Sequence, residues 1–113
     1  MTRFHDWPER LARFLEDAKL IEWPGESCGE FCAAAIETVT GVRFSTGFAD
    51  PEAGVAAAGL EEIPVNRAGR GDLVLHDRGL AIVGTDPRYA WGPAEDGGLA
   101  PVRTLRCRKA WKV

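Results

Sequence analysis

The sequence has little of what several classes of protein need. Its 113 residues include three cysteines, which cannot all pair and do not form a secreted disulfide framework. No apolar run reaches the length of a membrane span, and the opening residues MTRFHDWPER carry charge and proline where a signal peptide needs an apolar stretch. We therefore expect a chain that is cytoplasmic when it is made and is not inserted in a membrane.

An excess of positive charge is also missing. The net charge is −3 and the sequence pI is near 5.4, which argues against a nucleic-acid-binding protein. Residues 101–113 nevertheless hold five of the 14 basic residues and no acid. The favoured interpretation is a last strand whose outer edge is kept soluble by arginine and lysine. The alternative is that this basic end docks against an acidic partner.

The remaining composition is that of an ordinary soluble globular protein, with 45% hydrophobic and 27% charged residues. A chain of this length can bury a sizeable core without disulfides or metals. We expect one domain over residues 1–113.

Apolar residues at helical spacing predict a first helix over about 7–19 and a second over about 28–40. Gly41 then ends the second helix as a left-handed cap. Each predicted helix begins with a capping residue. Asp6 and Ser27 belong to capping boxes, and Asp50 opens a short third helix that ends before Gly59.

After Asn66 the pattern changes to short apolar runs separated by turn residues, which predicts strands. In the last strand, Cys107, Trp111 and Val113 are expected to share one face. Helices followed by an antiparallel sheet define an α+β fold. The predicted strands cover about 72–76, 80–83, 88–91, 99–102 and 105–113.

Cys28 is the candidate nucleophile, because it falls at the first turn of the second predicted helix. A thiolate at that position feels the positive end of the helix dipole and nearby amide donors, which favour its nucleophilic form. The alternative is a small, buried, structural cysteine.

A cysteine nucleophile needs an imidazole base and usually a polar group that orients it. His5 precedes the first helix and is expected at the surface. His76, at the end of a predicted strand, is the better candidate base, with Asp77 or Asp72 as the orienting carboxylate. The alternative is that His76 is simply a polar residue at a hairpin tip.

Two tryptophans are candidate substrate-binding residues. Trp23 lies just before Cys28, and Trp91 ends a predicted strand, so the two rings could line a groove for a peptide or sugar. Packing over the helix start is the alternative for Trp23.

A metal site is the alternative to core packing for the cysteines. Four side chains could supply a tetrahedral set, although cysteines four apart on one helix are weakly specific. We expect no metal or cofactor, and core packing is the working assignment for Cys32 and Cys107. The metal alternative would use Cys28, Cys32, Cys107 and His76.

A set of spaced residues resembles a known family. A tryptophan lies five residues before Cys28 and a phenylalanine three after it, with GDLVL and a strand ending in Gly84 further on. This pattern resembles the NlpC-like branch of the papain-like cysteine peptidases. It is more closely similar to a small subfamily encoded in phage and prophage tail gene clusters. The closer match rests on Trp23, Cys28, Phe31, Gly41, Gly71, Asp72 and the closing CRKAWKV.

The resemblance implies a papain-like, NlpC-type fold, with N-terminal helices packed on a C-terminal antiparallel sheet. Active members of that family cleave amide bonds in the stem peptides of bacterial peptidoglycan. This chain departs from their pattern at four positions. The family's base position falls on Gly79, its orienting residue falls near Trp91, and Ser27 and Pro24 replace the usual Asp and Gly.

The predicted function is therefore a phage or prophage tail-tip protein with a degenerate peptidase fold, used for assembly or cell-wall recognition. Its expected partners are other tail proteins and peptidoglycan peptides, and its expected final location is the virion tail. The alternative is an active cysteine peptidase with Cys28, His76 and Asp77 as its catalytic residues.

Overall fold

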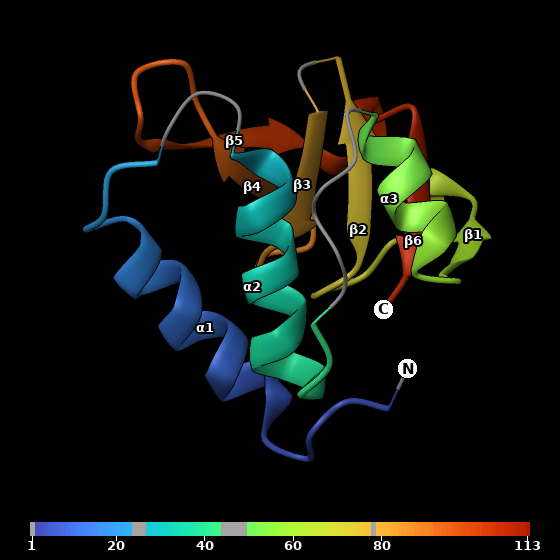
Figure 1. Cartoon of the computed structure of the whole chain (residues 1–113), viewed down its shortest axis with the longest axis horizontal. Coiled ribbons are helices and arrows are strands. Elements are labelled where there is room, and N and C mark those ends of the chain that lie inside the picture. The colour runs from blue at the N-terminus through green and yellow to red at the C-terminus, as the bar shows by residue number, and fades with distance from the viewer. Residues whose placement is uncertain (1, 24–26, 44–49, 78) are drawn as a thin grey trace.

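A computed structural model describes residues 2–23, 27–43, 50–77 and 79–113. It confirms the predicted α+β class, with helices packed on an antiparallel sheet (Figure 1). The described helices are α1 (Trp7–Ala18), α2 (Cys28–Thr40) and α3 (Pro51–Ala57). The described strands are β1 (Glu61–Ile63), β2 (Leu73–His76), β3 (Gly79–Val83), β4 (Tyr89–Pro93), β5 (Leu99–Arg103) and β6 (Lys109–Lys112). They form a sheet in the order β1-β6-β2-β3-β4-β5.

The helices form where the apolar spacing predicted them. The predicted stripe of α1 faces the core, with Leu11, Leu15 and Ala18 buried. Helix α2 is buried along most of its length and ends at Gly41 with φ +77°, the left-handed cap expected there. None of the described helices has both the length and the apolar character needed to cross a bilayer.

The predicted side-chain caps are wrong for two of the three helices. Neither Asp6 nor Ser27 makes a side-chain capping hydrogen bond, and Asp6 instead accepts a bond from Arg10 at 2.8 Å. Both residues have ψ near 20° rather than the extended backbone that aims a cap at the first amides. Asp50 has the extended conformation and accepts from the Glu52 amide at 3.1 Å, so this cap is confirmed.

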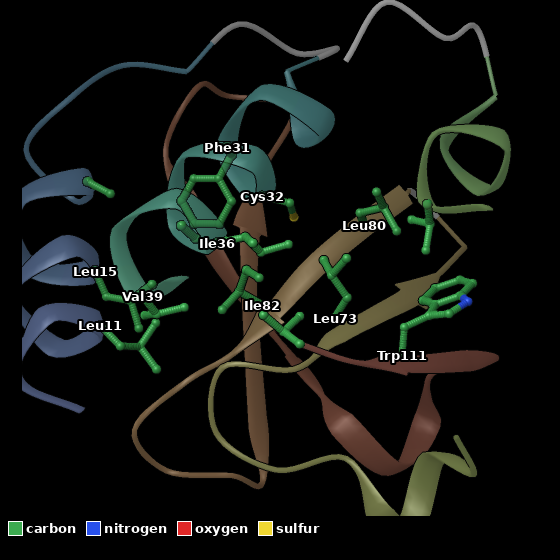
Figure 2. Packing of buried hydrophobic residues seen from close by; sticks show 14 residues of the cluster. Leu11, Leu15, Phe31, Cys32, Ile36, Val39, Leu73, Leu80, Ile82 and Trp111 are labelled. Atoms are coloured by element: carbon green, nitrogen blue, oxygen red, sulfur yellow. The ribbon is translucent and has the colours of Figure 1, made fainter. Parts of the chain in front are cut away.

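One face of the sheet and all three helices enclose the main hydrophobic cluster. Figure 2 shows leucines of α1, the buried side of α2 and residues from β2, β3 and β6 converging there. Period-two alternation along the strands selects which residues take part. Leu73, Leu80, Ile82 and Trp111 point to this face, whereas the strand residues between them do not.

The opposite face of the sheet carries a smaller cluster. Val74, Ala81, Val83, Ala90 and Ala110 are buried there, together with Cys107. The covering residues come from β1, from β5 and from the segment around a short 3₁₀ helix at Val65–Arg67.

The last predicted strand is shorter than expected. Thr104–Arg106 forms a 3₁₀ helix, and only Lys109–Lys112 is β6. The prediction that Cys107 shares a face with Trp111 is wrong, because the chain turns between them and breaks the alternation. Cys107 belongs to the smaller cluster, and Trp111 and Val113 belong to the main one.

The basic end is not an edge strand, which corrects the favoured interpretation of its charge. Strand β6 lies between β1 and β2, and the sheet edges are β1 and β5. The charge of Lys109 is balanced within the chain, because its ammonium lies 2.6 Å from Glu52 of α3. No strand is predicted at β1 from the residues themselves, since three residues are too few for a periodic signal.

Candidate functional site

Cys28 is the first residue of α2, as predicted, and is half-buried. It packs against the main hydrophobic cluster. The preceding residue, Ser27, is nearly buried, and its carbonyl oxygen accepts from the Phe31 amide at 2.9 Å. Pro24, which replaces the usual Gly of the family pattern, lies outside the described part of the chain. The sulfur is thus fixed at the start of a helix that is anchored in the core.

The first residue of β3 lies directly against this sulfur. A Cβ placed on Gly79 would be 2.8 Å from Cys28 Sγ, closer than two such atoms can approach. Gly79 has φ +134°, a conformation that other residues rarely adopt. This is the position to which the resemblance assigns the base, and the thiol there meets backbone and no side chain of residue 79.

The predicted base lies at the end of the neighbouring strand. His76 is paired with Gly79 in the β2–β3 register. Leu73 and Leu75 belong to the main cluster, and Val74 belongs to the smaller one. His76 is the last residue of β2, where its partner Gly79 departs from strand alternation by facing Cys28. Its role as a base stays a prediction.

The two candidate carboxylates differ in how they are held. The Asp77 side chain is 93% exposed, and its carboxylate lies 3.8 Å from Arg108. Asp72 lies at the other end of β2, about four residues or 13 Å away from His76 along the strand. Its carboxylate accepts hydrogen bonds from Arg3 and two backbone amides at that end, so Asp72 does not serve as the orienting residue. That role for Asp77 stays a prediction.

The Asp72 end is a hydrogen-bonded junction of distant segments. The carboxylate accepts from Arg3 at 2.8 Å, from the Gly69 amide at 2.9 Å and from the Val113 amide at 3.0 Å. Arg3 also donates to oxygens of Arg70 and Val113. The two ends of the chain therefore lie side by side (Figure 1). Sequence reasoning missed Arg3, since a single arginine carries no periodic or motif signal.

Trp23 lies close to the start of α2 and has a packing role. Its indole nitrogen donates to the Ala18 carbonyl at 3.0 Å, and its ring meets Phe31 edge-on with centroids 5.1 Å apart. Its amide donates to Gly97 in the turn between β4 and β5 at 2.6 Å. Trp23 thus joins both long helices to the sheet. A role in substrate binding stays a prediction.

Trp91 lines a different surface. It faces the helices beside Ile82, and the Lys19 ammonium lies 4.8 Å from its ring. A hollow of about 240 Å³ between α1 and β4 includes Trp91 but neither Cys28 nor Trp23. The contacts of the two tryptophans therefore do not define one shared groove.

The other two cysteines are buried on opposite faces of the sheet. Cys32 lies in the main cluster and Cys107 in the smaller one, so the four-ligand metal set does not come together. Burial, and secondarily the neighbouring Cys28, raises the pKa of Cys32 well above its usual range. Burial also raises the pKa of Cys107. Both thiols are therefore held neutral and unreactive.

Comparison with known proteins assigns the chain to a family without assigning an activity. The chain belongs to the family described as a domain of unknown function, DUF6950, whose sequence model matches residues 44–113. The match includes α3 and all the strands described above, and it begins after the helix that carries Cys28. No curated protein matches the chain significantly.

Proposed function

We propose that this protein is a non-hydrolytic relative of the NlpC-type cysteine peptidases, which serves assembly or recognition in a phage or prophage tail. The fold part of the proposal is supported by a helix that begins with a cysteine and packs on an antiparallel sheet. The tail part rests on the resemblance of the sequence.

One observation carries the loss of activity. The residue that occupies the base position is Gly79, and its backbone lies so close to Cys28 Sγ that any side chain there would collide with the sulfur. A base must come within about 3 Å of the proton that it removes. Residue 79 therefore supplies no acceptor to the thiol, whereas the peptidase mechanism requires one from this position.

The orienting position supports the same conclusion. Ile82 on β3 is paired with Trp91 on β4, the strand that would carry the polar residue in an active member. An indole has one N–H donor and no acceptor that could hold an imidazole. The resemblance thus retains the nucleophile position and lacks both of its supporting groups.

The competing function is an active peptidase that cleaves peptidoglycan stem peptides. The observation that favours it is the position of Cys28, half-buried at the first residue of a helix. In this case His76, the register partner of Gly79, would be the base that reaches the sulfur.

A cleavage assay separates the two functions. We expect the purified wild-type chain to release no more fragments from peptidoglycan than Cys28→Ala or His76→Ala does. Release by the wild type that both substitutions abolish, in variants that remain folded, would establish the peptidase and overturn the proposal.

Complementation tests the tail assignment. In a phage that carries this gene, deletion should abolish infectious particles, and both Cys28→Ala and His76→Ala should restore them. Normal titres after deletion would contradict a tail role. Failure of Cys28→Ala alone, with the protein present and folded, would favour the enzyme.

A further inference from the structure

A basic depression lies beside the Asp72 junction, on the opposite end of β2 from Cys28. It has a volume of about 560 Å³ and is bordered by Trp7, Asp72 and four cationic residues. A water molecule in the liquid occupies about 30 Å³, so the depression has room for a ligand much larger than a water molecule or a small ion. The cationic residues are Arg3, Arg67, Arg70 and Lys112.

The four cations divide into one that is neutralised and three that are not. Arg3 is bound by Asp72 and by an oxygen of Val113, and its side chain is only 17% exposed. Arg67, Arg70 and Lys112 are exposed and form no ion pair with any residue that the structure describes. The only carboxylate side chain that borders the depression, among the described residues, is already satisfied by Arg3 and two backbone amides.

The arginines are held close together despite their like charge. Arg3 lies 4.3 Å and Arg70 lies 5.6 Å from the Trp7 ring centroid, so a single indole contacts both guanidinium groups. Burial lowers the pKa of Arg3, Asp72 opposes this effect, and the charge of Arg70 acts in the same direction as burial. An anion placed here would relieve repulsion that the fold sustains without it.

We infer that this depression is a docking site for an acidic peptide segment of a partner protein. Its three free cations come from three places, the 3₁₀ helix, the turn before β2 and strand β6, so they surround the depression and can meet several carboxylates. Arginine forks bind carboxylates through two parallel hydrogen bonds. The site is independent of Cys28 and does not require it to react.

The charge of the rest of the chain favours a short acidic segment over nucleic acid. The net charge is −3 although this end of the molecule is basic, so the remaining surface repels a long polyanion. Glu61 of β1, an acidic residue opposite Lys112 in the register, adds to this repulsion. Nucleic-acid-binding proteins instead neutralise many phosphates along an extended basic track.

The test uses the full chain and a fluorescein-labelled hexapeptide of alternating glutamate and aspartate, with binding followed by anisotropy in about 150 mM salt. We expect saturable binding, and none to the matched peptide of glutamine and asparagine. Arg67→Ala, Arg70→Ala and Lys112→Ala should each weaken it by roughly three- to ten-fold, as expected for charge-assisted contacts.

Two substitutions remove the same charge elsewhere and serve as matched controls. Arg13→Ala on α1 and Arg106→Ala before β6 alter exposed cations that do not border the depression. Each should change the affinity by less than about two-fold, the range of screened surface charge. The double variant Arg67→Glu with Arg70→Glu should abolish binding while its denaturation midpoint stays near that of the wild type.

Three results would overturn the inference. One is an equal loss in the control and depression variants, which would mean unspecific attraction. Another is tighter binding of a single-stranded oligonucleotide than of the acidic peptide. The third is absence of peptide binding, whether or not inorganic phosphate or pyrophosphate occupies the site.

Discussion

The two ends of the β2–β3 hairpin hold polar groups in opposite ways. At one end, Asp72 is 6% exposed and accepts three hydrogen bonds. Arg3 and the Val113 amide are distant in sequence, and the Gly69 amide lies in the preceding turn. At the other end, Cys28 Sγ lies against the bare backbone of Gly79. A buried charge is tolerated only where it is paired and hydrogen-bonded, whereas a thiol tolerates an apolar neighbour. The first end therefore stabilises the fold through paired charge, and at the second end the sulfur is packed against the strand backbone.

The largest expected effect comes from breaking the Asp72 end. Asp72→Ala leaves the largely buried Arg3 guanidinium without its carboxylate and removes an acceptor from two amides. We expect a loss of about 3 kcal/mol in the free energy of unfolding, measured by urea denaturation.

The matched control for this variant is Asp77→Ala in the same hairpin. Its side chain is 93% exposed, so stability should hardly change. Equal losses for the two aspartates would show that the Asp72 junction does not stabilise the molecule.

The next effect comes from adding a side chain at the Cys28 end. Gly79→Ala introduces a Cβ against Sγ and imposes an unfavourable φ, so we expect a loss of roughly 2 kcal/mol. In a Cys28→Ala background the contact with sulfur disappears and part of the loss should be recovered. A double-mutant cycle in denaturant measures that coupling.

Gly59 provides the control for conformational strain alone. It has φ +72°, and a Cβ added there would meet no neighbouring group within 4 Å in the described part of the chain. Gly59→Ala should therefore show no coupling to Cys28→Ala. Absence of coupling for Gly79 as well would mean that the strand does not lie against the sulfur.

A smaller effect concerns Cys32, one turn further along α2 than Cys28. Burial raises its pKa above the ordinary thiol value of 9.0, so the folded chain binds this proton more tightly than the unfolded chain does. Its stabilising effect is complete below that value and declines as the pH rises above it. At a pH between the pKa of the unfolded chain and that of the folded chain, each such thiol lowers the free energy of unfolding by about 1.4 kcal/mol for every pH unit of increase.

Denaturation at pH 8, 9 and 10 measures this decline. Cys32→Ala should lower stability at pH 8, because it leaves a small cavity, and should make the decline less steep. Cys107→Ala should remove a smaller part of the slope, since its pKa is raised less strongly. An unchanged slope in the Cys32 variant would contradict its burial as a neutral thiol.

The smallest expected effect lies outside both ends of the hairpin. Glu52→Gln breaks the ion pair with Lys109. Both side chains of this pair are well exposed. Water and salt screen such a pair, so its loss should be close to the error of a denaturation measurement and should vanish in about 1 M salt. A loss as large as that of Asp72→Ala would remove the contrast between buried and exposed charge.

The elements that could be predicted from the sequence are those fixed by near neighbours. The stripe of Leu11 and Leu15 predicted α1, and the spacing from Phe31 to Val39 predicted α2. The caps at Asp6 and Ser27 were predicted wrongly, because the same residue types occur with a backbone that does not aim the side chain. Strand β1 was missed, since it is recognisable mainly by its pairing with β6.

The candidate site divides along the same line. Cys28 at a helix start followed from local pattern, and Gly79 was identified as the position opposite it through the resemblance. That the strand backbone contacts the sulfur follows from the packing of α2 on β3, which no local pattern specifies. Arg3 and Lys112 border one depression although they are more than a hundred residues apart.

The sequence by itself determined the α+β order, the three helices and the cysteine that begins the second one, because periodicity and turn residues act over a few neighbours. Only the tertiary structure decided that the basic last strand is internal, that Asp72 binds Arg3, and that Cys28 faces a glycine. These features depend on strand order and on contacts between distant segments. Such contacts form only when the whole chain buries its apolar residues together.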